Sequence, residues 1–330
     1  MKYRELGNTD IKISEIGFGA WTIALDWWGR KIDEDEAKRM IKKAYDCGIN
    51  FFETADMYGK GKSERLLGEA LDGVRDDVVI STKYGYDFAG VEQIGHSELP
   101  QRFDVKFTKK ALESSLERLR TDHIEMYGLH NPKMNHIRSD EPFNYLDGLV
   151  REGTIRTLQV ALGPAIGWRD EGVAAMSKKN VGAIQTVYNI LEQTPGNELM
   201  REAKTLNANI LVRVPDASGI LTGKITADTK IPKNDHRRDR KIEWRMAALK
   251  KVEQLRPIAD RNGLNITELA IKFILSQDAV GSVLPTVVDS SEIEMFSCIS
   301  DGRYLSDKDM AEIYEIYSSW PPYKLKSSVA

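Results

Sequence analysis

The stretch from Ile49 to Leu71 most constrains what this chain can fold into, because a strand, a reactive loop and a helix follow one another within it. It begins with an apolar run of strand length and ends in helix-spaced apolar residues behind Ser63, which we interpret as the helix N-cap. Between the two elements lie Asp56 and Tyr58, a carboxylate and a phenol two positions apart. The pattern places both groups beyond the C-terminal end of a strand, where parallel α/β folds bind their ligands.

Two further strand-like runs end in residues suited to the same chemistry. Lys83 follows the β-branched run 78–82, and His130 follows the run 124–129. A phenol has an ordinary pKa of about 10, so it needs a nearby cation to donate a proton at neutral pH. We therefore predict that Lys83 lowers the pKa of Tyr58 and that Asp56 is the carboxylate partner of Lys83. His130 is expected to hydrogen-bond a substrate carbonyl.

Three motifs carry a resemblance to a known family. They are NFFETADMYGKGKSERLLGEAL, the strand ending Ser81-Thr82-Lys83, and Leu129-His130-Asn131-Pro132. With these motifs the chain resembles the aldo-keto reductase family, from about Tyr3 to about Ile293. The resemblance implies a (β/α)8 barrel that transfers a hydride between a nicotinamide cofactor, usually NADPH, and a carbonyl or alcohol. It also implies a catalytic tetrad formed by Asp56, Tyr58, Lys83 and His130.

Strand-like runs alternate with helical segments along the chain, and this alternation by itself predicts an α/β fold with a parallel sheet. Eight strands closed into a TIM barrel follow from the resemblance. Segments 2–6 and 11–14 flank a turn-rich quartet and predict an N-terminal β-hairpin. Thr108 is expected to open a helix over 109–119, and residues 133–140 are expected to form a loop. We interpret residues 1–330 as one domain with a loose tail from about residue 320.

The loops after the first and third barrel strands are expected to shape a substrate pocket. The first strand, 16–20, carries Gly17 and Gly19, which would either let a ligand approach the backbone or ease tight packing. A long polar loop, 84–106, includes His96, which we leave unassigned. The predicted pocket residues are Trp21, Trp27, Trp28, Tyr58 and His130. A packed loop anchor explains one of the tryptophans equally well.

The resemblance also assigns a cofactor site. Gln185 matches the glutamine that binds the nicotinamide carboxamide, but Ala161-Leu162 replaces the usual Ser-Asn pair. Arg213 stands where many members have an aromatic that stacks on the nicotinamide, although an arginine paired with Glu192 is the alternative. The expected cofactor-binding residues are Gly19, Trp21, Asp56, Gln185, Arg213, Pro215, Gly219, Leu221, Gly223, Lys224, Pro285, Thr286 and Glu292.

The choice between the two nicotinamide cofactors depends on the segment after the last strand. Thr286 holds the position of the family's phosphate-binding lysine, and Glu292 holds that of its arginine. A 2′-phosphate facing a carboxylate is repelled, whereas an acidic residue can accept a hydrogen bond from an unphosphorylated ribose. NADP(H) is the family default, but we expect NADPH to be favoured by less than about tenfold, with NAD(H) possible. Arginines in the tract 235–241 are an alternative source of positive charge.

Composition bears on the kinds of partner, the cellular compartment and the use of the cysteines. A net charge of −3 and a pI near 6.1 give no indication of a nucleic-acid partner. The apolar stretches are too short to span a membrane, and the first ten residues lack the apolar centre of a signal peptide, so we expect a cytoplasmic protein. Cys47 and Cys298 build no disulfide framework and no metal site, and we interpret them as buried thiols on helices. The sequence carries no signal for an oligomeric state or a particular substrate.

Three functions are weighed. The first is an NAD(P)-dependent oxidoreductase acting on an aldehyde, ketone or aldose, or on the corresponding alcohol, with Tyr58 as general acid/base. The second is a nucleotide-binding regulatory or partner subunit with little turnover, suggested by the change at Ala161-Leu162. The third, a metal-dependent hydrolase, needs a cluster of histidines and carboxylates at several strand ends. Of the five histidines, only His130 is placed at a strand end, which disfavours the third.

Overall fold

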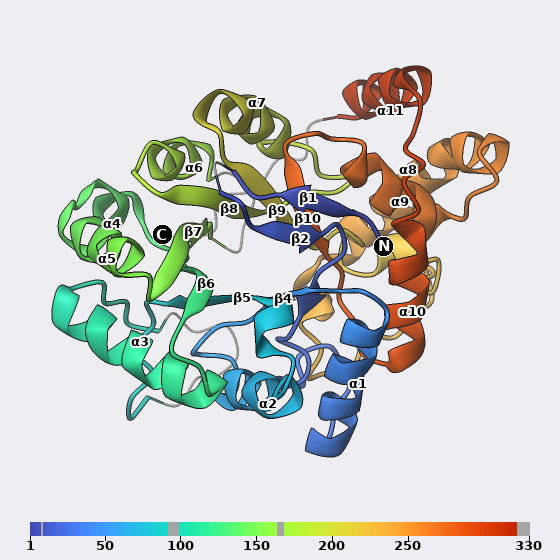
Figure 1. The fold of residues 1–330 in the computed structure, drawn as a ribbon. Helices are drawn as coiled ribbons and strands as arrows, with labels where there is room; N and C mark the ends of the chain where they lie inside the picture. The colour runs from blue at the N-terminus through green and yellow to red at the C-terminus, as the bar shows by residue number, and fades with distance from the viewer. Residues whose placement is uncertain (8, 92–98, 164–167, 322–330) are drawn as a thin grey trace.

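A computed structural model describes residues 1–7, 9–91, 99–163 and 168–321. Within these ranges eight parallel strands form a sheet in sequence order, from β3 to β10, which curves into a barrel (Figure 1). The ends of the sheet meet where Ile16 pairs with Val283 and the Gly17 N–H donates to the Val283 carbonyl at 2.9 Å. The expected (β/α)8 barrel is therefore confirmed. Its strands are β3 Phe18–Gly19, β4 Phe51–Glu53, β5 Val79–Tyr84, β6 Ile124–His130, β7 Ile155–Ala161, β8 Val181–Val187, β9 Asn209–Arg213 and β10 Val280–Leu284.

Helices surround the barrel and cover the outward faces of its strands (Figure 1). They are α1 Glu34–Asp46, α2 Lys62–Ala70, α3 Val105–Leu119, α4 Met134–Arg138, α5 Glu141–Glu152, α6 Arg169–Met176, α7 Gly196–Leu206, α8 Ile242–Arg261, α9 Ile266–Leu275, α10 Ser290–Ile299 and α11 Asp307–Ser319. Short 3₁₀ turns are η1 Arg75–Asp77, η2 Ile220–Thr222 and η3 His236–Asp239.

Several expected helix starts are corrected by the structure. Helix α2 begins at Lys62 behind Gly61, and Ser63 is not its cap, because the buried Ser63 hydroxyl donates to the Ala20 carbonyl at 2.7 Å. Helix α3 begins four residues before the expected start, because the Asp104 side chain caps it by accepting from Phe107 N at 3.0 Å. The segment expected as a loop before α5 contains the short helix α4.

The glycines of the first strand serve different purposes. A Cβ on Gly17 would lie 2.7 Å from Phe51 Cδ1 and 2.8 Å from Leu284 Cδ2, so this position must be glycine for packing. A Cβ on Gly19 would meet nothing closer than 3.8 Å, and this residue borders the cavity at the strand ends. The packing interpretation therefore holds at Gly17, and the approach of a ligand to Gly19 stays a prediction.

Inward side chains along the strands form a lower apolar layer and an upper polar layer. The predicted hairpin, β1 Tyr3–Glu5 paired with β2 Lys12–Ser14, lies across the end of the barrel where the strands begin (Figure 1). Its apolar side chains pack into the barrel end in a separate cluster that consists of Leu6, Ile11, Ile13, Phe51, Val79, Met126, Ala183, Leu211 and Leu284. This plug closes one end, so a ligand can enter only from the other.

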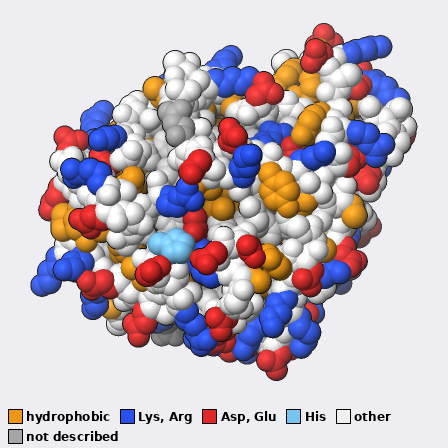
Figure 2. Space-filling model, viewed as in Figure 1, with side chains coloured by type: hydrophobic (Ala, Val, Ile, Leu, Met, Phe, Trp, Pro, Cys, Tyr) orange, Lys and Arg blue, Asp and Glu red, His pale blue; other side chains and the backbone are white. Residues whose placement is uncertain are grey.

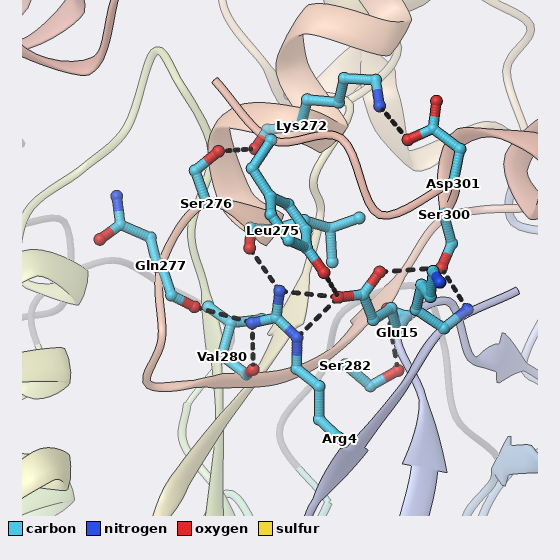
Figure 3. A network of polar contacts seen from close by, with 12 residues as sticks. Arg4, Glu15, Lys272, Leu275, Ser276, Gln277, Val280, Ser282, Ser300 and Asp301 are labelled. Atoms are coloured by element: carbon cyan, nitrogen blue, oxygen red, sulfur yellow. Dashed lines mark hydrogen bonds and ion pairs between the residues drawn. The ribbon is translucent and has the colours of Figure 1, made fainter. Parts of the chain in front are cut away.

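A buried polar network ties the hairpin to the last strand (Figure 3). The Arg4 guanidinium contacts Glu15 at 2.8 Å and donates to the carbonyls of Gln277 at 2.9 Å and Val280 at 2.8 Å, and also to that of Leu275. The Glu15 side chain is only 1% exposed. Because every donor direction of Arg4 meets an acceptor, the cost of burying this charge is offset.

Charged side chains of both signs lie on the face of the molecule in Figure 2. On the face in Figure 2, Lys and Arg side chains are interspersed with Asp and Glu. In the described residues, no helix is long and apolar enough to cross a membrane.

Cys298 is exposed and Cys47 is half-buried, so the expectation of two buried thiols is wrong for Cys298. Trp320 is fixed by a hydrogen bond to Gln254 at 2.7 Å, and the tail beyond residue 321 lies outside the described residues.

Replacing Arg4 with alanine is expected to lower the free energy of unfolding by about 3–5 kcal/mol, because Glu15 would remain buried without its partner. Urea denaturation measures this change. Lys12→Ala is the matched control, since its contact with Glu5 is 3.9 Å long and both side chains are more than two-thirds exposed. The control should change stability by less than about 0.5 kcal/mol. Equal effects of the two substitutions would contradict the role given to the network.

Candidate active site

A cavity of about 790 Å³ opens at the C-terminal ends of the strands, opposite the hairpin plug. Its walls include every residue of the expected substrate pocket, namely Trp21, Trp27, Trp28, Tyr58 and His130. Five of the expected cofactor residues also line it: Gly19, Trp21, Gln185, Arg213 and Thr286. The sequence reasoning missed other lining residues, among them Glu53, Tyr86, Asn131, Trp168 and His236. The size lies within the range of small-molecule sites.

The carboxylate partner of Lys83 is Glu53, which corrects the expectation that it is Asp56. Lys83 Nζ forms an ion pair with Glu53 Oε1 and donates to the Thr54 carbonyl at 2.6 Å. The Gln185 amide also donates to Glu53 Oε1, at 2.9 Å. Lys83 is fully buried and Glu53 is 3% exposed. Glu53 therefore fixes two of the expected site residues at once.

The reason for this pairing is the alternation of side chains along a strand. Glu53 ends β4 two residues after the inward-facing Phe51, and it pairs in register with Ser81 of β5. Lys83 is two residues beyond Ser81, so it faces the same interior. Asp56 lies past the end of β4, where its backbone N–H donates to the Lys83 carbonyl at 3.0 Å.

The side chain of Asp56 lies apart from the cavity wall. It is 3% exposed, and its Oδ1 atom has no hydrogen-bond partner within the described ranges. Burial raises the pKa of Asp56 well above its ordinary value, and the charge of Glu64 raises it further, while Arg118 and Lys83 oppose these effects. Asp56 acts on Lys83 only as a distant charge.

The electrostatics of the expected acid and its neighbours also differ from the sequence expectation. Tyr58 meets His130 edge to face with ring centroids 5.8 Å apart, and Lys83 Nζ lies 5.2 Å from the Tyr58 ring centre. Burial raises the pKa of Tyr58 well above 10, the charge of Glu53 raises it further, and Arg213 is the leading influence that lowers it. For Lys83 the effect of burial has the opposite sign: burial lowers its pKa, although the charge of Glu53 raises it.

His130 is a neutral imidazole at the cavity wall. Burial lowers its pKa well below the usual 6.5, and the charges of Lys83 and Arg213 lower it further. Its Nδ1 atom is buried and has no hydrogen-bond partner among the described residues. The Tyr86 ring meets it edge to face at 5.1 Å. A neutral imidazole can donate one hydrogen bond and accept another, which suits recognition of a carbonyl oxygen.

Arg213 is not paired with Glu192, so the alternative weighed from the sequence is wrong. Glu192 forms its ion pair with Arg240 at 2.8 Å. Arg213 Nη2 instead donates to the carbonyl oxygens of Leu162 at 2.7 Å and Gly163 at 2.6 Å. Leu162, the second residue of the pair that replaces the family's Ser-Asn, therefore supplies a backbone acceptor to Arg213, as does its neighbour Gly163. The neighbouring Pro164 lies outside the described residues.

An aromatic wall joins two distant loops on another side of the cavity. The ring of His236 stacks on Trp21 at 5.4 Å, and Trp28 meets both rings edge to face. The guanidinium of Arg237 lies 4.3 Å from the Trp28 ring centre and forms an ion pair with Asp235. The sequence predicted the tryptophans as pocket residues but gave no signal for His236, because only folding brings the two loops together.

The loop after β9 has the backbone geometry of an anion site. Val214, Ala217, Ser218 and Gly219 all have positive φ, at 56°, 48°, 56° and 87°. Such angles strain a non-glycine residue, especially a β-branched one, and such strain clusters at ligand sites. Turns of this kind can direct successive N–H groups into one concavity, as phosphate oxygens require. Pro215 and Leu221 are buried supports of the loop, and the 3₁₀ turn η2 lies between Gly219 and Gly223.

Beyond this loop, an ion pair connects η2 to the start of α10. Lys224 Nζ contacts Glu292 Oε1 at 2.9 Å, and Glu292 Oε2 accepts from Val288 N at 2.9 Å. Asp289 caps α10 by accepting from Glu292 N at 3.1 Å. Glu292 lies in the segment that follows Pro285 and Thr286, and its carboxylate is already paired with Lys224, which the sequence predicted as a cofactor-binding residue.

The donors present fit a nicotinamide dinucleotide. The cavity wall carries a phenol, a neutral imidazole and an amide, the kinds of group that can bind a nicotinamide and a carbonyl. A metal centre has less support, since the described part of the chain contains no group of three or more His, Cys, Asp or Glu placed to bind an ion. Barrel and site together define the class of nicotinamide-dependent oxidoreductases.

Comparison with known proteins identifies the family. The model of the Aldo/keto reductase family matches residues 15–318. The NADH-specific methylglyoxal reductase of Escherichia coli (strain K12) is 30% identical, over 96% of this chain and 100% of its own. The Uncharacterized oxidoreductase YqkF of Bacillus subtilis is 27% identical, over 94% of each chain. The holo form of an aldo-keto reductase from Bacillus halodurans superposes with a TM-score of 0.78 at 25% identity, covering 96% of each chain.

The chain belongs to the aldo/keto reductase family, and it is an NAD(P)H-dependent oxidoreductase.

The pairing of Lys83 can be tested with two isosteric substitutions. Glu53→Gln is expected to lower the free energy of unfolding by about 3–5 kcal/mol, because Lys83 would be buried without a counter-charge. It should also lower kcat/KM by about tenfold or more through the loss of Lys83 positioning. Asp56→Asn is the control and should keep kcat/KM within about threefold. Carbonyl reduction and urea denaturation measure both variants.

The Asp56→Asn variant also tests the raised pKa of Asp56, because its stability relative to wild type should depend on pH. The pKa of Asp56 is raised in the folded protein, so protonation of Asp56 favours folding and its ionisation opposes folding. Wild type should therefore lose stability relative to Asp56→Asn as the pH rises above the unfolded value of about 4. A greater loss of activity in Asp56→Asn than in Glu53→Gln would restore the sequence expectation for Asp56.

Proposed function

We propose that this protein reduces a small aldehyde, ketone or aldose, with Tyr58 as the general acid. The proposal is carried by one observation: Tyr58 and His130 meet at the wall of one cavity, and Lys83 Nζ lies 5.2 Å from the Tyr58 ring centre. A nicotinamide bound there supplies the hydride. The chain itself has to bind the carbonyl, orient it, exclude water and deliver a proton to its oxygen.

The proton step follows from the contacts at Tyr58. The His130 imidazole is held neutral by burial, so it can donate one hydrogen bond to the carbonyl oxygen and aim it at the Tyr58 hydroxyl. As the oxygen gains negative charge, Tyr58 transfers its proton to it. Lys83 and Arg213 favour the phenolate that remains. The Glu53 carboxylate keeps Lys83 in place throughout.

The aromatic wall suggests how water is excluded. Trp21, Trp28 and His236 form one packed unit. A carbonyl lying between this wall and Tyr58 would be covered on an apolar side. The wall suits a compact substrate with apolar or hydroxylated substituents. The alternative of a binding subunit with little turnover is not favoured, because Tyr58, His130 and Arg213 all line the cavity.

Tyr58→Phe is expected to lower kcat by ~10²–10⁴-fold, the range of general acid catalysis, and to leave cofactor binding nearly unchanged. Reduction of a panel of aldehydes and aldoses with both cofactors measures this effect. Tyr86→Phe removes a hydroxyl from the same cavity and should lose less than about tenfold. If Tyr58→Phe kept more than half of the wild-type kcat with chemistry rate-limiting, Tyr58 would not be the acid.

For the cofactor, we infer that NADH is accepted about as well as NADPH, with NADPH favoured by less than about tenfold. Glu292 holds Lys224, so that lysine offers less charge to a 2′-phosphate. Arg237 and Arg240 are also committed, to Asp235 and Glu192. A relative that is 30% identical carries the name NADH-specific methylglyoxal reductase, which supports the acceptance of NADH.

Glu292→Gln is expected to strengthen NADPH binding relative to NADH by about tenfold, because it removes a repulsive carboxylate and releases Lys224. Dissociation constants at low salt, from quenching of tryptophan fluorescence, measure the ratio. Glu294→Gln is the matched control two positions along α10, since its ion pair with Lys43 lies on an exposed surface. A wild-type preference for NADPH of a hundredfold would reveal a phosphate site that these contacts do not contain.

A further inference from the structure

Arg213 is a cation without a counter-ion in the reaction cavity. It ends β9 and lines the cavity together with Tyr58 and Gln185. Both of its hydrogen bonds run from Nη2 to backbone carbonyls, those of Leu162 and Gly163. Across the described ranges it forms no ion pair with a carboxylate. Backbone carbonyls fix its position without cancelling its charge, so its field extends into the cavity.

The charged and titratable groups near Arg213 do not cancel its positive charge. The charge of Glu53 is already balanced by Lys83 at contact distance. His130 is neutral because burial lowers its pKa. Lys133 also lines the cavity, but it is exposed, and water screens it. Arg213 carries the permanent charge, since a guanidinium stays protonated even where burial lowers its pKa.

A nicotinamide ring that acts on a carbonyl at Tyr58 must share this cavity with Arg213. The loop 214–219 with its positive φ angles follows Arg213 directly in the chain, and it leads into Gly219, Leu221, Gly223 and Lys224, which the resemblance assigns to the cofactor. The oxidised ring carries a positive charge and the reduced ring is neutral, so the two forms experience the field of Arg213 differently.

We propose that Arg213 discriminates between the two redox states of the cofactor by weakening the binding of the oxidised form relative to that of the reduced form. The inference rests on the proposed function in that it needs the cofactor to bind in this cavity. Like charges at close range in a partly desolvated site repel strongly enough to change an affinity by tenfold or more. Arg213 then acts through charge, and a lysine should replace it in part.

The test compares dissociation constants of NADH and NAD⁺, measured by quenching of tryptophan fluorescence in wild type, Arg213→Gln and Arg213→Lys. We expect the dissociation constant of wild type for NAD⁺ to be at least about tenfold higher than that for NADH. In Arg213→Gln the ratio of the two constants should fall by about tenfold, and in Arg213→Lys it should stay within about threefold of wild type. Arg256→Gln, on the exposed side of α8, is the matched control for removal of an arginine charge and should leave the ratio unchanged.

The possible outcomes separate the inference from the function on which it rests. A wild-type protein that bound neither nucleotide would overturn the proposed function. A protein that bound both, with an Arg213→Gln ratio equal to that of wild type, would overturn the role of Arg213 alone. Equal weakening of NADH and NAD⁺ in Arg213→Gln would also overturn it, because that result describes a structural support. Thermal unfolding confirms that each variant is folded before binding is measured.

Discussion

The alternation of side chains along the barrel strands is the constraint on which the rest of the structure depends. Every second residue faces the interior, and the interior changes character along the strands. Near the strand starts it is apolar and sealed by Leu6, Ile11 and Ile13 of the hairpin. Near the strand ends it is polar and contains Glu53 and Lys83. One closed end and one chemically active end follow from the same period of two.

The two buried cations of the upper polar layer differ in whether a carboxylate neutralises them. Lys83 and Glu53 neutralise each other, which lowers the free-energy cost of burying both charges. Lys83 Nζ also lies against the Tyr58 ring. Arg213 has no such partner and is fixed by carbonyl groups instead. One paired cation and one unpaired cation beside the same phenol can therefore take different roles, the first in positioning and the second in electrostatics.

Local patterns predicted the parallel α/β architecture, the hairpin and most strands, because periodicity and turn chemistry are properties of neighbouring residues. The closed barrel was predicted from the family resemblance. The local patterns were less reliable for the carboxylate that meets Lys83. Asp56 is closer to Tyr58 in the sequence, but Glu53 has the register that faces the barrel interior. The loop between β5 and α3 was expected to shape the pocket, and its described residues Tyr86, Leu99, Pro100 and Gln101 do line the cavity. Residues 92–98, which include the unassigned His96, lie outside the described residues.

The sequence by itself determined the family, the parallel α/β architecture and the reactive side chains Tyr58, Lys83 and His130, because each follows directly from a strand run and its flanking motif. Tertiary structure alone decided which charges meet. The pairs Lys83 with Glu53 and Lys224 with Glu292 join residues 30 and 68 positions apart. The stacking of His236 on Trp21 likewise depends on two loops that meet only in the folded barrel. Such pairings depend on strand register and loop packing, which no local pattern encodes.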